Sequence, residues 1–131
     1  IEHAIVSAYK NESPDVIVIE GQGSLMNPAY PGGFEILAAG RPDFVILQHA
    51  PTRKEYDGFP GYKLHSLKKQ INAIEMISGV KVMAITVNHE GMKPEEIEPA
   101  CKAITEQTGL PAFDVLAHGT TKLVKLIDAK L

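Results

Sequence analysis

The most informative part of the chain reads Val16-Ile17-Val18-Ile19-Glu20-Gly21-Gln22-Gly23-Ser24-Leu25. Four apolar residues run directly into an acid and then into two glycines one residue apart. An unbroken apolar run of this kind predicts a strand at 15–20 that is buried on both faces of a sheet. Open α/β sheets bind ligands at the carboxyl ends of their strands, so Glu20 is placed to hold a metal ion that carries phosphates. The alternative is a strand-terminal acid that caps the next helix or pairs with a surface lysine.

The composition indicates one ordinary globular domain. A chain of 131 residues is long enough to enclose a core, and 44% hydrophobic with 22% charged residues is typical of soluble proteins. A formal net charge of −3 with scattered lysines argues against a nucleic-acid-binding surface. The single cysteine, Cys101, excludes an internal disulfide and suits a small buried apolar position. No run is apolar for long enough to span a bilayer and no signal peptide is evident, so we expect a cytoplasmic protein that does not enter a membrane.

Helical and strand patterns alternate along the chain. Helical periodicity already begins at Ile1, with no entry loop before it, so we expect a piece of a longer protein. Gly79 is a natural stop for one helix, and Pro94 with the acids after it is a natural start for another. We expect helices at about 1–11, 33–39, 65–78, 94–108 and 120–130, and strands at 15–20, 43–48, 81–87 and 111–115. This order predicts a parallel sheet with right-handed crossovers.

The loops that follow the predicted strands hold nearly all the chemically active side chains. Because the strands are parallel, these loops share one edge of the sheet. The side chains concerned are Glu20, Gln22, Ser24, His49, Arg53, Asn88, His89, Asp114 and His118. Loops at the opposite edge, such as those around Ser13 and Gly109, carry little beyond turn residues. This asymmetry predicts a binding site at the first edge.

A complete phosphate-binding loop is missing from the sequence. The pattern G-x-x-x-x-G-K-[ST] does not occur, and Gly21-Gln22-Gly23 is too short to replace it, so a phosphate cradle would lie upstream of Ile1. Glu20 nevertheless suits Mg²⁺, which is often held by one or two carboxylates plus substrate phosphates. Ser24 either donates to a phosphate or caps a turn.

Polar residues also follow the second predicted strand. His49 is a candidate general acid or base, and Arg53 or Lys54 can neutralise an anionic group. The alternative is a solvated basic turn with a structural histidine. The stretch 57–62, rich in glycine and aromatic residues, is either a lid over a ligand or an exposed excursion.

The third and fourth predicted strands end in polar residues as well. The Asn88 amide offers a donor and an acceptor, which suits the edge of a purine, although an asparagine followed by His89-Glu90-Gly91 also suits a turn. Asp114 and His118 flank the last strand and would contact a base or sugar, or would cap a helix or turn.

Several short stretches, taken together, resemble a prokaryotic family that was long known as a domain of unknown function. They are Glu20-Gly21-Gln22-Gly23-Ser24-Leu25 with Pro28-Ala29-Tyr30, Arg41-Pro42-Asp43, Leu47-Gln48-His49-Ala50-Pro51-Thr52-Arg53, Ile85-Thr86-Val87-Asn88 and Gly109-Leu110-Pro111-Ala112-Phe113-Asp114. The family has a Rossmann-like N-terminal half and a P-loop C-terminal half. Its characterised branch, the DgcN type, is a D-glutamate N-acetyltransferase. The resemblance implies that residues 1–131 are the C-terminal portion of the P-loop nucleotide-binding domain.

At the level of fold and site, the same layout is similar to dethiobiotin synthetase. There an E-G-x-G stretch supplies a Mg²⁺ ligand, matching Glu20, and a strand-end asparagine reads adenine, matching Asn88. The resemblance implies a three-layer αβα fold of P-loop NTPase type that lacks its P-loop strand. In such folds that strand lies between those matching 15–20 and 43–48. We therefore expect a gap in the sheet, and either low stability or a homo-oligomer paired through the open sheet.

The resemblance implies an enzyme that transfers an acyl group from acetyl-CoA to an acidic amino acid, a small-molecule substrate. ATP is the alternative nucleotide ligand, with Mg²⁺ at Glu20. The expected roles are catalysis by Glu20, His49 and Arg53, and ligand binding by Gly21, Gln22, Gly23, Ser24, Gln48, Asn88 and Asp114. Two other functions stay open: an ATP-dependent ligase or kinase of a small carboxylate, and a non-catalytic nucleotide-binding or interaction domain.

Overall fold

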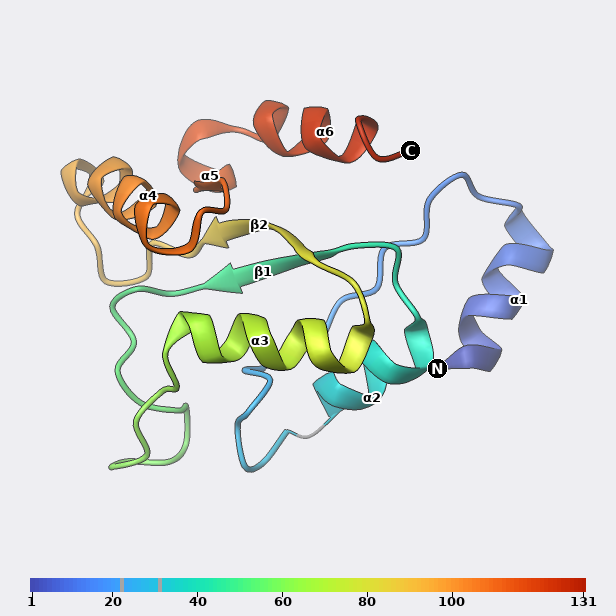
Figure 1. Cartoon of the computed structure of the whole chain (residues 1–131), viewed down its shortest axis with the longest axis horizontal. Coiled ribbons are helices and arrows are strands. Elements are labelled where there is room, and N and C mark those ends of the chain that lie inside the picture. Colours follow the sequence, from blue (N-terminus) through green and yellow to red (C-terminus); the bar gives the residue numbers. More distant parts are fainter. Residues whose placement is uncertain (22, 31) are drawn as a thin grey trace.

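The computed structural model describes residues 1–21, 23–30 and 32–131, and helices and strands alternate through most of this part of the chain (Figure 1). The elements are α1 (Glu2–Glu12), α2 (Gly32–Gly40), β1 (Val45–His49), α3 (Leu67–Ser78), β2 (Val82–Val87), α4 (Pro94–Thr108), β3 (Ala112–Phe113), α5 (Val115–His118) and α6 (Thr121–Asp128). None of the helices in the described part of the chain has the length and apolar character needed to cross a bilayer.

The three strands form one parallel sheet in the order β1-β2-β3. Leu47 of β1 lies opposite Ile85 of β2, and Ile85 lies opposite Ala112 of β3. Figure 1 shows α2 and α3 on one side of the sheet and α4, α5 and α6 on the other. The fold is therefore the three-layer α/β/α arrangement that the sequence predicts.

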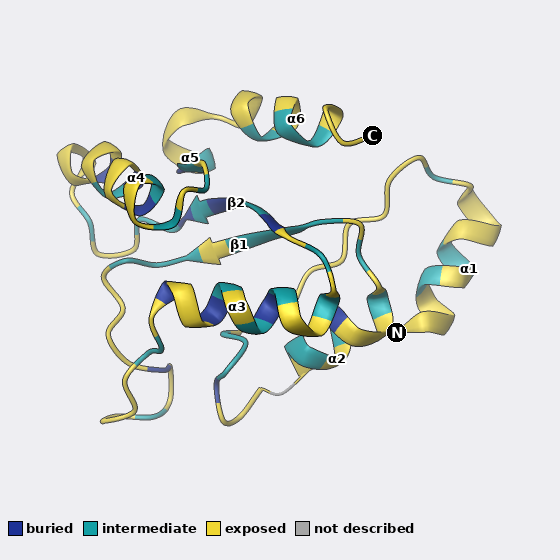
Figure 2. Ribbon diagram, in the orientation of Figure 1, coloured by how far each residue is buried: buried dark blue, intermediate teal, exposed yellow. Residues whose placement is uncertain are grey.

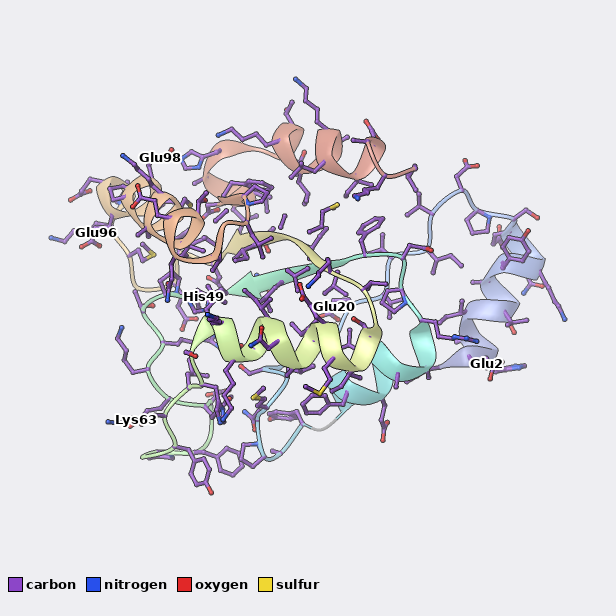
Figure 3. The ribbon with its side chains drawn as sticks, viewed as in Figure 1. Glu2, Glu20, His49, Lys63, Glu96 and Glu98 are labelled. Atoms are coloured by element: carbon purple, nitrogen blue, oxygen red, sulfur yellow. The ribbon has the colours of Figure 1, made fainter. Side chains whose placement is uncertain are left out.

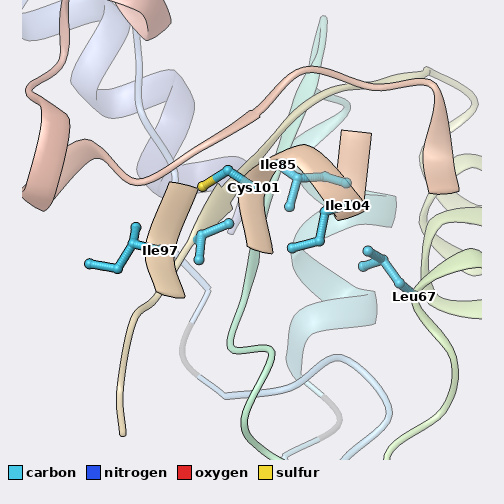
Figure 4. Close-up of a cluster of buried hydrophobic side chains, with 6 residues drawn as sticks. Leu67, Ile85, Ile97, Cys101 and Ile104 are labelled. Atoms are coloured by element: carbon cyan, nitrogen blue, oxygen red, sulfur yellow. The ribbon is translucent and has the colours of Figure 1, made fainter. Parts of the chain in front are cut away.

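The core lies on both faces of β2. Its residues Val82, Ala84, Ile85 and Val87 are all at most 3% exposed, because strands flank β2 on both edges and helices cover both its faces. One apolar cluster joins Leu67 of α3 and Ile85 to α4, through Ile97, Cys101 and Ile104 (Figure 4). Burial of each large aliphatic side chain in the cluster stabilises the folded state by about 1.5–3 kcal/mol. The expectation that Cys101 is a small buried residue is confirmed.

The helix ends follow the local signals in the sequence. Helix α3 begins where Ser66 accepts a hydrogen bond from the Lys69 backbone N–H, and it ends at Gly79, whose φ of 76° lies in the left-handed region. Helix α4 begins at Pro94, where the Glu96 carboxylate accepts from the backbone N–H of Lys93 at 2.7 Å. These caps explain why the predicted ends of α3 and α4 match the observed ones closely.

The prediction of a buried strand at 15–20 is wrong for this structure. Residues 16–20 have no regular secondary structure and belong to no sheet, and their side chains are exposed, with Val18 at 87%. A strand needs a neighbour for its backbone groups, and no strand of the described chain pairs with this segment. Its contact is instead with α2, where a Cβ on Gly40 would lie 3.3 Å from the Ile19 Cδ1 atom.

The end of the chain also differs from the prediction of a single helix at 120–130. The chain forms the short helix α5 first and then α6, which ends at Asp128. The Asp114 side chain caps α5 by accepting from the backbone N–H groups of Leu116 and Ala117, so β3 stops at Phe113 rather than 115. A carboxylate at the end of a strand has thus started a helix earlier than the apolar periodicity indicates.

Candidate functional site

The carboxyl ends of β1, β2 and β3 bring several polar side chains to one edge of the sheet. The backbone N–H of Asn88 donates to the carbonyl of His49 at 2.8 Å, which continues the β1–β2 pairing past the end of β2. We call this group the strand-end site; it consists of His49, Arg53, Asn88, His89, Glu90 and Asp114. The sequence predicted that these loops meet, and for these residues the structure confirms it.

His49 is the last residue of β1 and lies at the tip of that strand (Figure 3). Burial lowers the pKa of its imidazole below the ordinary value of 6.5, and the positive charge of Lys54 lowers it further. The ring is therefore neutral at neutral pH, as a proton acceptor must be. Gln48, one residue earlier, is exposed on the same strand.

Arg53 is paired with Glu90 across the site. Its Nε and one terminal guanidinium nitrogen lie 2.9 and 2.5 Å from a single Glu90 carboxylate oxygen, and Thr52 Oγ1 donates to the Glu90 carbonyl. Both charged side chains are about half exposed, at 45% and 54%, so the pair contributes about 1 kcal/mol at most to stability. The pair uses two of the five N–H groups of the Arg53 guanidinium.

Asn88 has a turn role in the structure. Its Oδ1 accepts from the backbone N–H of Glu90 at 3.0 Å, which is the turn geometry considered as the alternative to purine binding. Its amide nitrogen has no hydrogen-bond partner among the residues that the structure describes. One half of the amide therefore shapes the turn, and the other half is open to a ligand.

Asp114 and His89 form a hydrogen-bonded pair in the site. The Asp114 side chain is fully buried, and its Oδ2 lies 2.5 Å from His89 Nδ1. Burial works to raise the pKa of Asp114, but the three hydrogen bonds that its carboxylate accepts outweigh this effect, so the pKa lies below the ordinary value of 3.8. The sequence places His89 among the polar side chains at this edge and in a turn after Asn88, but does not pair it with Asp114. The sequence does show that β2 and β3 are both followed by polar residues. Predicting the His89–Asp114 pair from this pattern also requires knowing that β2 and β3 are neighbouring strands.

The segment after residue 20 lies elsewhere. Figure 3 shows Glu20 well apart from His49 in the view. Gly21 faces α2, where a Cβ would lie 3.6 Å from Ile36 Cδ1, and Gly23, with φ 84°, lies against Tyr30. Within the described chain, no hydrogen bond or ion pair joins Glu20, Gly21, Gly23 or the Ser24 side chain to the strand-end site. Gln22 lies outside the described residues.

The long loop after β1 is anchored at its base. The buried Tyr56 places its hydroxyl 2.7 Å from His65 Nδ1, and Glu55 pairs with Lys63 in an antiparallel bridge. Asn27 Nδ2 donates to the Asp57 carbonyl, which ties this loop to the one after residue 20. A shallow hollow of about 340 Å³ lies between this loop and the Arg53–Glu90 pair. Its size suits a small ligand.

The described residues do not form a complete metal site. No group of three His, Cys, Asp or Glu side chains in the described ranges is close enough to share an ion. Glu20 supplies one carboxylate, whereas Mg²⁺ prefers six oxygen ligands. Any Mg²⁺ held here would take most of its ligands from a bound nucleotide, from water and from residues beyond those described.

A parallel sheet between two helical layers, with polar residues at the carboxyl ends of its strands, defines a three-layer α/β/α domain (Figure 1). The comparisons with known proteins make this specific. The family profile described as "Domain of unknown function (DUF1611_C) P-loop domain" matches residues 1–124. The chain belongs to this family, which confirms the resemblance drawn from the sequence.

Two curated relatives carry the same name, D-glutamate N-acetyltransferase. The protein from Tritonibacter scottomollicae is 34% identical over 86% of this chain, and the one from a Pseudoalteromonas species is 30% identical over 92%. The matched regions are 35% and 40% of the lengths of those relatives, so this chain spans well under half of either.

A solved structure supports the fold. The crystal structure of a DUF1611 family protein from Anabaena variabilis superimposes with a TM-score of 0.87 at 24% identity. The match covers 98% of this chain and 39% of that protein. The chain therefore spans about two fifths of the length of that protein.

Proposed function

We propose that this chain is the P-loop-domain portion of an enzyme that transfers the acetyl group of acetyl-CoA to the amino group of D-glutamate. The observation that carries the proposal is the identity of 34% and 30% to two proteins of that name across 86% and 92% of the chain. The strand-end site supports it, because the transfer needs a group that accepts a proton and a group that binds carboxylates, and the site offers both.

The substrate side of the proposed reaction is the Arg53 region. A guanidinium can bind a carboxylate through two N–H groups, and two N–H groups of Arg53 already donate to one carboxylate oxygen of Glu90. D-glutamate has two carboxylates, and one of them would replace Glu90 at Arg53. His49, with a neutral ring at the end of β1, and Gln48 beside it would line the same side.

The nucleotide side of the proposal has two parts. Coenzyme A contains an adenine nucleotide, and the open amide nitrogen of Asn88 suits the acceptor positions of a purine, with Asp114 near the same strand ends. Glu20, Gly21, Gln22, Gly23 and Ser24 would line the phosphate or acyl-acceptor side, with Mg²⁺ held between Glu20 and phosphate oxygens. Acetyl-CoA is favoured over ATP by the names of the relatives.

The chain would form the C-terminal portion of the P-loop domain. The sequence contains no G-x-x-x-x-G-K-[ST] motif, and Val16, Ile17, Val18 and Ile19 are exposed without strand partners. A strand from another part of the full-length protein, placed between this segment and β1, would bury these side chains and complete the sheet. A second copy of the chain is the other possible source of such a strand.

The test uses the full-length protein that contains this sequence. Incubation with acetyl-CoA and D-glutamate is expected to release free CoA thiol and to form N-acetyl-D-glutamate, with L-glutamate as the matched control. Release of ADP from ATP with a small carboxylate would instead support a ligase or kinase. If no product forms in either assay but a nucleotide raises the melting temperature, the domain is a non-catalytic binding module.

A further inference from the structure

We propose that the His89 imidazole, held by Asp114, is the base that takes a proton from the substrate amine during acetyl transfer. This assignment rests on the proposed function and adds to it a residue for the proton-transfer step. It differs from the expectation drawn from the sequence, which gave the acid–base role to His49.

The contacts of the pair fix the state of the imidazole. The carboxylate of Asp114 can only accept hydrogen bonds when it is ionised, and its Oδ1 accepts from the backbone N–H groups of Leu116 and Ala117, each at 2.9 Å. Its Oδ2 faces His89 Nδ1 at 2.5 Å, so Nδ1 must carry the hydrogen. In the neutral ring, Nε2 then carries the lone pair and can accept a proton.

Burial differs sharply between the two members of the pair. Asp114 is 0% exposed, whereas the His89 side chain is 39% exposed. Nε2 of His89 has no hydrogen-bond partner within the described chain. A buried acid that orients a partly exposed imidazole is the arrangement that general-base catalysis requires, because the acid stabilises the imidazolium that forms.

The other histidines lack this arrangement. His49 has no carboxylate partner in the described chain, and burial disfavours its protonated form. His65 Nδ1 is hydrogen-bonded to the Tyr56 hydroxyl. His118 lies 3.8 Å from Glu98, and the side chains of His118 and Glu98 are both exposed. His3 lies in α1, a helix with no buried residue. Of the five histidines in the sequence, His89 is the one with a buried carboxylate behind it.

The position of His89 also suits the reaction. The next residue, Glu90, is the partner of Arg53, the residue proposed to bind the substrate carboxylate. Asn88, on the other side of His89, has its amide nitrogen open. In the sequence, His89 therefore stands between Asn88, proposed for the nucleotide, and Glu90, the partner of Arg53.

The step balances as follows. The neutral amine nitrogen of the substrate attacks the thioester carbonyl carbon of acetyl-CoA, and a carbon–nitrogen bond forms. The extra proton on that nitrogen passes to His89 Nε2 as the carbon–sulfur bond breaks. The CoA thiolate leaves with the bonding electrons and takes the proton from the imidazolium, which regenerates the neutral ring and gives free thiol.

The experiment compares His89→Gln, Asp114→Asn and His3→Gln in the full-length protein, with thiol release as the readout. His89→Gln should lower kcat by about 100-fold or more, leave the KM for acetyl-CoA within about threefold, and remove the acid limb of the pH profile of kcat. Asp114→Asn should lower kcat by at least about tenfold, because the imidazole loses the carboxylate that orients it. His3→Gln should match the wild type.

Two results would overturn the assignment. One is a His89→Gln enzyme that keeps kcat within about threefold of wild type, or that keeps the acid limb of the profile. The other comes from nitrogen-15 NMR of the His89 ring in the wild-type protein, which needs no substitution: the expected tautomer has hydrogen on Nδ1, and hydrogen on Nε2 would contradict it. A wild-type enzyme that releases no thiol with D-glutamate would overturn the proposed function itself, and this assignment with it.

Discussion

Two apolar stretches of similar sequence have opposite surroundings in this molecule. Val82–Val87 forms β2 and is mostly buried, whereas residues 16–19 have no regular secondary structure and are exposed (Figure 2). Strand β2 has a strand on each edge and helices on both faces, whereas residues 16–19 pair with no strand of the described chain, and Ile19 lies against Gly40 of α2. The comparison teaches that an apolar β-branched run indicates a tendency to form a strand, and that its neighbours decide whether the strand forms.

The largest expected effect comes from a substitution in β2. Ile85→Ala removes a side chain that is 0% exposed at the centre of the sheet and should lower the free energy of unfolding by about 2–5 kcal/mol. Urea denaturation measures the change. Val18→Ala, at a side chain that is 87% exposed, is the matched control and should change stability by about 0.5 kcal/mol or less in residues 1–131.

The same control becomes a sharper test in the full-length protein. If a strand from elsewhere covers residues 16–19 there, Val18→Ala should cost about 2 kcal/mol, because two buried methyl groups are lost. An unchanged urea midpoint in the full-length protein would show that Val18 stays exposed there. The difference between β2 and residues 16–19 would then come from their own sequences and not from a missing neighbouring strand.

A smaller loss is expected at Asp114. Asp114→Ala leaves two backbone N–H groups of α5 and the His89 ring without their acceptor, which should cost about 2–3 kcal/mol. Thermal unfolding gives the change. Asp128→Ala, at an exposed aspartate that ends α6, should leave the melting temperature within about 1–2 °C of wild type. Equal effects of the two changes would contradict the capping role of Asp114.

The strand-end site should also make stability depend on pH. The folded pKa of His49 lies below 6.5, so the folded protein binds fewer protons there than the unfolded chain, and this part of the stability is full above pH 6.5 and is lost as the pH falls toward the folded value. The lowered pKa of Asp114 adds a further loss below about pH 3.8. His49→Gln should flatten the first slope only, in urea titrations between pH 5 and 7. An unchanged slope would exclude His49 as its source.

The smallest effect on stability is expected at the exposed pair Arg53–Glu90. Arg53→Gln should change the free energy of unfolding by about 1 kcal/mol or less, since both side chains are about half exposed. Under the proposed function it should still raise the KM for D-glutamate at least about tenfold, by the loss of a charged hydrogen bond to the carboxylate. Glu90→Gln keeps the guanidinium free and should not raise that KM. If Arg53→Gln and Glu90→Gln raise the KM for D-glutamate equally, the effect comes from loss of the Arg53–Glu90 ion pair, and Arg53 does not bind the substrate carboxylate.

Much of the fold could be predicted from local signals. Gly79 and Gly109 end α3 and α4 with φ values of 76° and 73°, and Pro94 starts α4, so these bounds follow from residues within one turn. The strand at 15–20 could not be placed in the same way, because its formation depends on hydrogen bonds to a distant part of a polypeptide. The split of the last helix depends on a side-chain cap by Asp114, which apolar periodicity does not register.

Only part of the candidate site could be predicted, because some of its contacts depend on the strand order and not on local sequence. That His49, Asn88 and Asp114 share an edge follows from parallel strands, and the structure brings them together. The pairing of His89 with Asp114 spans 25 residues and needs the strand order β1-β2-β3, which no local pattern supplies. Glu20 was placed in the site on the assumption of a paired strand, and this structure has no contact between it and the strand ends.

The most direct test of the central claim is to map where acetyl-CoA binds on the full-length protein by NMR, with the amides of this domain labelled. We predict that acetyl-CoA shifts the signals of Asn88, His89 and the residues that follow β3, at the carboxyl ends of the strands. Shifts confined to the opposite edge, around Ser13 and Gly109, would contradict the account, because the strand-end site would then have no part in binding the acetyl donor.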